Sequence, residues 1–142
     1  MVQTRALTRP DPHGTTRRVG HVYAEARIFA RRSARARFLV DTGATYTIVP
    51  PSVARLVGAT PSASRFRVKL ADGSRRSVRA CTMGIALLNR TAPMTTLLIP
   101  GAEPLLGAET LEALGLRVNP STRHLEPTRS HAVLLVSVNV AR

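Results

Sequence analysis

The chain has 142 residues, enough for one domain with a hydrophobic core of ordinary size. That core must be mainly aliphatic, because the chain has no Trp and only 3 Phe and 2 Tyr. Its 21 basic and 8 acidic residues give a formal net charge of +13, and Lys69 is the single lysine. Such an excess fits a nucleic-acid-binding protein or an arginine-rich but otherwise ordinary surface. We favour the ordinary surface because the arginines are scattered along the chain.

Cysteine and histidine usage excludes the common disulfide and metal sites. Cys81 is the only cysteine, so the chain has neither an intramolecular disulfide nor a cysteine-based metal site. The histidines follow no ligand spacing, and they are His13, His21, His124 and His131. We therefore expect no metal and no cofactor. A run of 18 apolar residues and an apolar signal core are also lacking, so we expect a cytoplasmic protein without membrane contact.

The N-terminal segment differs in composition from the rest of the chain. Residues 1–18 are polar, basic and interrupted by prolines and a glycine, and they show no hydrophobic period. We predict a flexible basic N-terminal arm over 1–18 and a single domain over 19–142. Apolar residues alternate through 21–30, which predicts the first half-buried strand of that domain.

A hairpin that ends in a carboxylate is predicted next. Residues 31–36 are polar and predict a turn, and residues 37–40, which are apolar from Phe38 on, predict a short strand that pairs with the first. This strand leads directly into Asp41. A carboxylate at the end of an apolar strand is costly, which makes Asp41 a candidate functional residue. Residues 47–49 predict another short strand, and a helix follows that begins at Pro50-Pro51-Ser52 and ends at Gly58.

The middle of the chain predicts a second hairpin. Two alternating runs within 66–88 flank Ala71-Asp72-Gly73, and Asp-Gly between strands is a strong hairpin signal. Residues 95–99 predict one more apolar strand. A loop bracketed by glycine and prolines then leads to the Leu-Leu-Gly segment at 105–107.

The last elements are a short helix and more strands. Acidic residues in the first turn and a glycine at the end predict a helix over 108–115. Residues 116–127 predict a strand, a turn and a returning strand. Residues 131–140 predict a final strand, apolar enough to be buried or to pair with a partner chain.

These elements together favour an all-β, barrel-like single domain with two short helices. A strand, a loop with glycine, a helix and a terminal glycine occur at 38–58 and again at 96–115. This weak internal echo suggests an internal pseudo-two-fold axis.

Asp41-Thr42-Gly43 is the motif that carries chemistry. A loop that leaves a strand can aim one carboxylate into a cleft, and the Gly43 N–H can donate a hydrogen bond to that carboxylate. The Thr42 hydroxyl can bond to neighbouring backbone. Three residues alone also fit an ordinary aspartate turn or a helix cap. The context is more specific, because an apolar strand precedes the motif, and the Thr47 hydroxyl and Ile48-Val49 follow it.

Three segments in combination resemble the retropepsin-like aspartic proteases, the single-domain relatives of pepsin. They are FLVDTGATYTIV (38–49), VKLADGS (68–74) and LLGAETLEALGL (105–116). The resemblance covers roughly residues 20–128 and is closer to the prokaryotic and retroelement members than to the viral enzymes. It implies an all-β acid-protease barrel with one or two short helices, which hydrolyses peptide bonds as an aspartic endopeptidase without a cofactor.

The resemblance implies that Asp41 is the catalytic residue, within an active-site loop that includes Thr42, Gly43 and Ala44. In the family, the threonine belongs to a hydrogen-bonded grip between two loops, and the glycine contacts the carboxylate and the substrate backbone. The chain has only one D-T-G motif and therefore one such carboxylate. An active enzyme of this type must be a symmetric homodimer that acts on a polypeptide substrate, with Asp41 contributed by each subunit.

The remaining site residues also follow from the resemblance. The hairpin tip Ala71, Asp72 and Gly73 corresponds to the flap that closes over an extended substrate. Substrate pocket and buttress positions correspond to Thr45, Tyr46, Leu105, Leu106 and Gly107. Thr45 and Tyr46 replace acidic residues of the viral enzymes. Ala108 replaces an arginine that supports the viral dimer, so this dimer must be held in another way, for which 131–140 is a candidate.

Two other functions fit the sequence. A retropepsin-fold binding or dimerisation module would keep Asp41 only for the hydrogen bonds of its loop. A basic nucleic-acid-binding protein would use the arginine runs at 17–18, 31–37 and 75–79. Few aromatic residues are available to stack on bases, so nucleic acid is a possible but less favoured partner.

Overall fold

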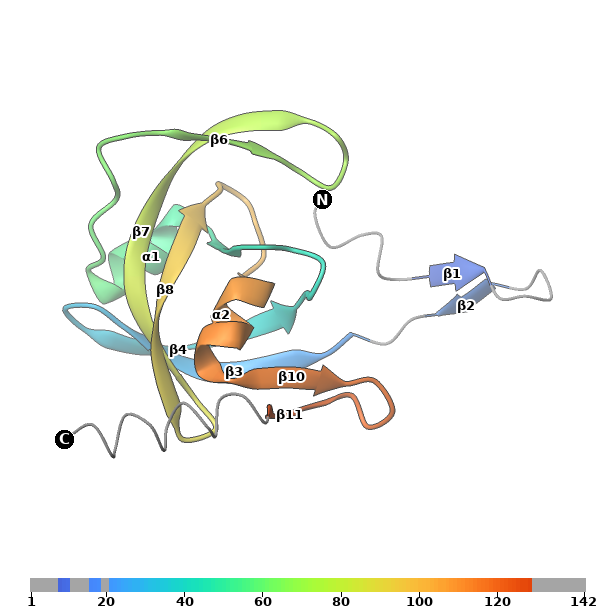
Figure 1. Cartoon of the computed structure of the whole chain (residues 1–142). Coiled ribbons are helices and arrows are strands. Elements are labelled where there is room, and N and C mark those ends of the chain that lie inside the picture. Colours follow the sequence, from blue (N-terminus) through green and yellow to red (C-terminus); the bar gives the residue numbers. More distant parts are fainter. Residues whose placement is uncertain (1–7, 11–15, 19–20, 129–142) are drawn as a thin grey trace.

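A closed barrel forms the body of the computed structural model, which describes residues 8–10, 16–18 and 21–128 (Figure 1). Its strands are hydrogen-bonded in the order β3-β4-β9-β5-β8-β7-β6, and an additional β3–β7 pairing closes the ring. The strands are β3 (Tyr23–Phe29), β4 (Ser33–Val40), β5 (Thr47–Val49), β6 (Phe66–Lys69), β7 (Arg75–Leu87), β8 (Arg90–Leu98) and β9 (Leu105–Leu106). The predicted all-β barrel is confirmed.

Two smaller antiparallel sheets accompany the barrel. β10 (Leu116–Asn119) pairs with β11 (His124–Pro127), as the strand–turn–strand pattern of 116–127 predicts. β1 (Thr8–Pro10) pairs with β2 (Thr16–Arg18) inside the N-terminal arm, where the sequence shows no period. The predicted strand at 131–140 lies outside the described residues.

Two predicted boundaries in the hairpins are wrong. β4 begins at Ser33, so the turn before it is short and does not extend over 31–36. Arg35 and Arg37 are exposed, while Ala34 and Ala36, which alternate with them, are partly buried, and these small residues gave a weak alternation signal. β8 begins at Arg90 and not near residue 95, because Leu88 and Asn89 have positive φ angles of 51° and 60° and close a tight hairpin.

Buried side chains occupy both faces of the central strands. The larger core packs inside the barrel against α1 (Pro51–Val57) and α2 (Ala108–Leu114), and it includes Phe38, Ile28 and Ile85. A smaller core lies on the opposite face, beneath the β6–β7 hairpin, and it includes Ile48 and Leu97. β7 contributes to both cores. Val78 and Ala80 near its start belong to the smaller core. The buried residues of its remaining part, Cys81, Met83, Ile85 and Leu87, point to the other face and belong to the larger core.

The barrel is built from two similar halves. β4 pairs parallel with β9, β8 pairs parallel with β5, and β5 and β9 pair antiparallel at the centre. A helix follows the short strand of each half, and each helix ends at a glycine in the left-handed region, Gly58 at φ 73° and Gly115 at φ 68°. The internal echo in the sequence therefore corresponds to a structural repeat, and both predicted helix ends are confirmed.

The two loops that leave β4 and β8 have the same backbone hydrogen bonds. The Asp41 N–H donates to the Leu106 carbonyl at 3.0 Å, and the Ile99 N–H donates to the Val49 carbonyl at 3.0 Å. A second hydrogen bond closes each turn. The Ala44 N–H donates to the Asp41 carbonyl, and the Ala102 N–H donates to the Ile99 carbonyl, both at 3.1 Å. Ile99 therefore occupies, in the second half, the place that Asp41 occupies in the first.

Candidate active site

The Asp41 carboxylate is positioned by its own loop. Asp41 follows β4 and is half-buried, and the Gly43 N–H donates a hydrogen bond to its Oδ1 at 2.9 Å. A Cβ atom at residue 43 would lie 3.2 Å from the same oxygen, so a glycine keeps this contact uncrowded. The predicted bond from the Gly43 N–H to the carboxylate is confirmed. The second carboxylate oxygen has no hydrogen bond within the described residues.

Helix α2 holds the other end of the loop. The Ala108 and Glu109 N–H groups donate to the carbonyls of Ala44 and Thr45 at 2.7 and 3.0 Å. At Gly107 a Cβ atom would lie only 2.5 Å from the backbone of the loop. The first turn of the helix can approach the loop this closely only because residue 107 has no side chain.

A buried hydroxyl pair connects the same two segments. Thr47 Oγ1 and Thr110 Oγ1 lie 2.7 Å apart, and the Gly107 N–H donates to Thr47 Oγ1 at 3.2 Å. Both threonines are almost fully buried. Sequence reasoning noted the Thr47 hydroxyl but missed Thr110, which carries no signal beyond being a polar residue on the apolar side of a short helix.

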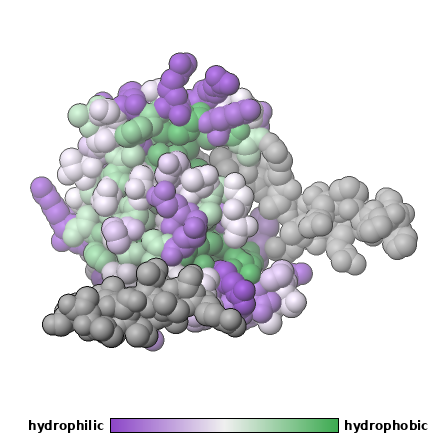
Figure 2. Space-filling view, in the orientation of Figure 1, coloured by the Kyte–Doolittle hydropathy of each residue, from purple (hydrophilic) through white to green (hydrophobic). Residues whose placement is uncertain are grey.

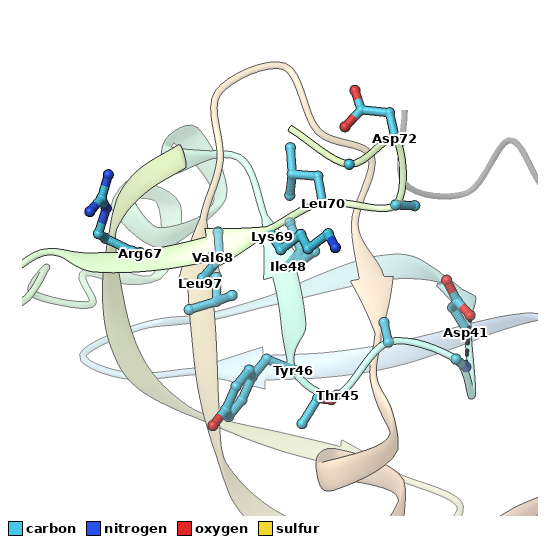
Figure 3. A pocket seen from close by; sticks show the side chains of 14 residues that line it. Asp41, Thr45, Tyr46, Ile48, Arg67, Val68, Lys69, Leu70, Asp72 and Leu97 are labelled. Atoms are coloured by element: carbon cyan, nitrogen blue, oxygen red, sulfur yellow. Dashed lines mark hydrogen bonds between the residues drawn. The ribbon is translucent and has the colours of Figure 1, made fainter. Parts of the chain in front are cut away.

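A groove of about 950 Å³ runs between the Asp41 loop and the β6–β7 hairpin. Ile48 and Leu97 form its apolar floor, and the hairpin residues 67–73 form the opposite wall. Figure 3 shows Asp41 and the tip of the hairpin at one end of the groove and Arg67 at the other. The hairpin is thus placed as a cover over the space that the carboxylate faces.

The tip of this hairpin is internally hydrogen-bonded. Asp72 Oδ1 accepts hydrogen bonds from the Ser74 hydroxyl at 2.6 Å and from the Ser74 N–H at 2.9 Å. These bonds, the side-chain bond first, lower the pKa of the Asp72 carboxyl below its ordinary value of 3.8. The turn also closes through Leu70 and Ser74, and Gly73 adopts a φ of 87° that suits a glycine. The tip is therefore a defined turn at neutral pH.

Most residues singled out from the sequence meet in the groove. Its lining includes Asp41, Gly43, Ala44, Thr45, Tyr46, Ala71, Asp72 and Gly73. Thr42 is exposed and outside the lining. Leu105, Leu106 and Gly107 are buried behind the loop, so they are not part of a pocket wall. The lining residues to which the sequence analysis gave no site role are Ile48, Arg67, Val68, Lys69, Leu70 and Leu97.

The groove offers a single carboxylate on a strand-end loop. Its other acidic residue, Asp72, is on the hairpin tip and bonded to Ser74. Ile99, at the place equivalent to Asp41, is 4% exposed and apolar. Within the described residues, no group of three His, Cys, Asp or Glu side chains is placed to hold a metal ion. None of the helices among those residues is long and apolar enough to cross a membrane.

Comparison with known proteins agrees with this geometry. Residues 32–120 match the family described as "gag-polyprotein putative aspartyl protease". The barrel and the strand-end aspartate define a retropepsin-like domain. The chain belongs to this aspartyl protease family.

Solved structures share the fold at low sequence identity. EIAV protease in complex with the inhibitor HBY-793 superposes with a TM-score of 0.56 at 14% identity, covering 70% of this chain and 93% of the protease. The retroviral protease-like domain of Ddi1 from Leishmania major gives a TM-score of 0.54 at 17% identity, covering 79% of this chain and 91% of the domain. No curated protein sequence matches the chain. These neighbours establish the retropepsin-like fold.

Proposed function

We propose that the protein is an aspartic endopeptidase that works as a homodimer, with one Asp41 from each subunit. The observation that carries this proposal is the structural equivalence of Asp41 and Ile99. The fold repeats the loop but not its carboxylate, so one chain provides half of a two-carboxylate site. A two-fold axis beside the Asp41 loops would supply the second carboxylate from the same residue of the partner.

A pair of Asp41 carboxylates has the chemistry that this reaction needs. Two carboxylates within a few ångströms cannot both ionise easily, so the pair keeps one proton and contains one base and one acid. The base removes a proton from a water between them, the water attacks the peptide carbonyl, and the acid donates a hydrogen bond to the developing oxyanion. The apparent pKa values of such a site belong to the pair.

The shape of the groove supports an extended peptide as the substrate. Its floor is apolar and its cover is a β-hairpin, whose backbone can bond to an added strand. The hairpin acts as a flap that closes over the bound peptide and excludes water from the reaction. Strand β4 fixes the backbone of Asp41, and the Gly43 N–H fixes its carboxylate by a hydrogen bond. The carboxylate therefore stays directed at the cleaved bond.

The test is the replacement Asp41→Asn, assayed on a peptide mixture by mass spectrometry. We expect loss of all cleavage with an unchanged fold, because the amide still accepts the bond from Gly43 but cannot act as the base. Glu25→Gln removes an exposed carboxylate from β3, outside the groove, and is expected to cleave normally.

Normal cleavage by the Asp41→Asn variant would refute the proposed mechanism. If the wild-type protein forms a dimer but cleaves no peptide between pH 3 and 8, roughly the range in which carboxylate pairs titrate, the domain is a binding or dimerisation module.

A further inference from the structure

The flap strand contributes two cations to the groove. Arg67 and Lys69 on β6 both line it, and both side chains are exposed. They alternate with Val68 and Leu70, which pack on the smaller core beneath the hairpin. The flap therefore combines apolar side chains that hold it on the barrel with cationic side chains that are free for another role.

Within the part of the chain that the structure describes, these cations have no acidic partner. The single ion pair among the described residues joins Arg117 and Glu126, far from the flap in the sequence. The hydrogen bonds of the same part of the chain do not involve the Arg67 or Lys69 side chains, and Asp72 is bonded to Ser74. The flap thus presents positive charge that a ligand can neutralise.

The surroundings of the groove add to this charge. Figure 2 shows strongly hydrophilic side chains gathered over the β6–β7 hairpin at the top of the molecule, next to apolar surface. The exposed basic residues of the hairpin and of the residue before it are Arg65, Arg67, Lys69, Arg75, Arg76 and Arg79, and Asp72 is the one acidic residue between 65 and 79. A cleft walled by charges of one sign concentrates ligands of the opposite sign.

We propose that Arg67 and Lys69 make the groove selective for acidic peptides, with carboxylate side chains about two and four residues from the cleaved bond. The positions follow from the course of β6. Seven consecutive residues, 67–73, line the groove, and Figure 3 shows Lys69 and then Arg67 progressively farther from the Asp41 end. Lys69 lies two residues and Arg67 four residues from Ala71 at the tip. An extended peptide has the same rise per residue as β6, so its side chains two and four residues from the cleaved bond would lie beside Lys69 and Arg67.

This selectivity rests on the proposed function and defines its substrate class. In the homodimer each subunit adds one Arg67 and one Lys69, so the preference applies on both sides of the cleaved bond. The apolar floor at Ile48 and Leu97 accepts the intervening side chains, which point the other way in an extended peptide.

The first experiment compares peptide pairs that differ only by Glu or Gln at these positions. We expect kcat/KM about fivefold to tenfold higher for the Glu peptide at low salt, since exposed ion pairs each contribute a few-fold. The preference should shrink at 1 M salt, where charges are screened beyond about 3 Å. Equal rates for the two peptides would overturn the proposal.

Variants of the flap assign the effect to these residues. The double replacement of Arg67→Gln with Lys69→Gln should abolish the preference, and Arg67→Glu with Lys69→Glu should reverse it. The matched control, Arg75→Gln with Arg76→Gln, removes the same charge from the same hairpin outside the groove lining and should keep the preference. A control that loses as much preference as the test variant would overturn the assignment.

A binding measurement tests the preference for acidic peptides independently of the proposed protease activity. Fluorescent Glu and Gln peptides are titrated onto the Asp41→Asn protein, which cannot cleave them. If the wild-type protein cleaves nothing but this variant binds the Glu peptide several-fold more tightly, the acidic preference stands and the protease function fails. Equal binding of both peptides, together with displacement by a single-stranded oligonucleotide, would overturn the proposal in favour of nucleic acid.

Discussion

Gly107 determines how closely α2 can approach the Asp41 loop. The carbonyl of Tyr46 and that of Thr45 lie where a side chain at residue 107 would begin. These are backbone atoms of a loop that is hydrogen-bonded at both ends, so they cannot move aside without moving the loop. Gly107, which the family resemblance assigns to the buttress of the loop, therefore determines the geometry of the Asp41 loop.

The replacement Gly107→Ala should lower both stability and peptide cleavage. Overpacking of this kind costs about 1–3 kcal/mol, and the shifted loop carries Asp41, the carboxylate of the proposed site. Chemical denaturation and kcat/KM measure the two effects. The control Gly101→Ala meets no atom within 4 Å but has a φ of 77°, so it should lower stability by about 1–2 kcal/mol and leave the Asp41 loop intact. Full activity of Gly107→Ala would show that the loop tolerates the shift.

The bonds from Ser74 make the flap tip sensitive to acid. Because they lower the pKa of Asp72, its ionised form is favoured in the folded tip. The contribution to the order of the tip is fully present above 3.8 and is lost as the pH falls through the lowered value. The Ser74 amide resonance, followed by NMR, should titrate with a midpoint below 3.8, and Asp72→Ala should abolish that titration. A midpoint at or above 3.8 would contradict the bonded turn.

At the scale of elements, an arginine binds the C-terminal end of the helix in each half of the barrel. Arg32, before β4, donates to the carbonyl of Leu56 at the end of α1 at 3.2 Å. Arg90, at the start of β8, donates to the carbonyl of Leu114 at the end of α2 at 3.2 Å. A cationic side chain at a helix C-terminus satisfies free carbonyls and interacts well with the helix dipole. Each half thus fixes its helix to its own hairpin.

The threonine pair joins β5 to α2, and a double-mutant cycle should reveal the coupling. Thr47→Val leaves the Gly107 N–H and the Thr110 hydroxyl without their partner, at a cost of about 1–3 kcal/mol. Thr110→Val leaves Thr47 bonded to Gly107, so it should cost less. The double variant should cost less than the two added together, because neither hydroxyl is then buried alone. Urea unfolding at one protein concentration measures this, and strict additivity would rule out the coupling.

At the scale of the whole molecule, the proposed site, shared by two subunits, predicts how mixed dimers behave. When wild-type and Asp41→Asn chains exchange freely in equal amounts, only dimers with two wild-type chains keep both carboxylates. Activity should therefore fall to about one quarter of that of an all-wild-type sample at the same total concentration. A value near one half would mean that each chain acts alone and would contradict the shared site.

Local sequence patterns predicted much of the fold. Alternating runs marked the strands of both hairpins, and Gly58 and Gly115 marked the helix ends, because these signals depend only on residues a few positions apart. The missed starts of β4 and β8 have a local cause as well. Alternating alanines give little hydrophobic contrast, and the turn at Leu88 and Asn89 lacks the usual glycine.

The sequence by itself determined that one carboxylate ends an apolar strand, that a glycine two residues later can bond to it, and that no second D-T-G motif exists. Only the tertiary structure decided which distant residues surround that carboxylate. It brought Gly107 and Thr110 against the loop from about sixty residues away, and it brought the flap, with Arg67 and Lys69, to the groove. The physical reason is that the groove is made by pairing between strands remote in sequence, which no local pattern encodes.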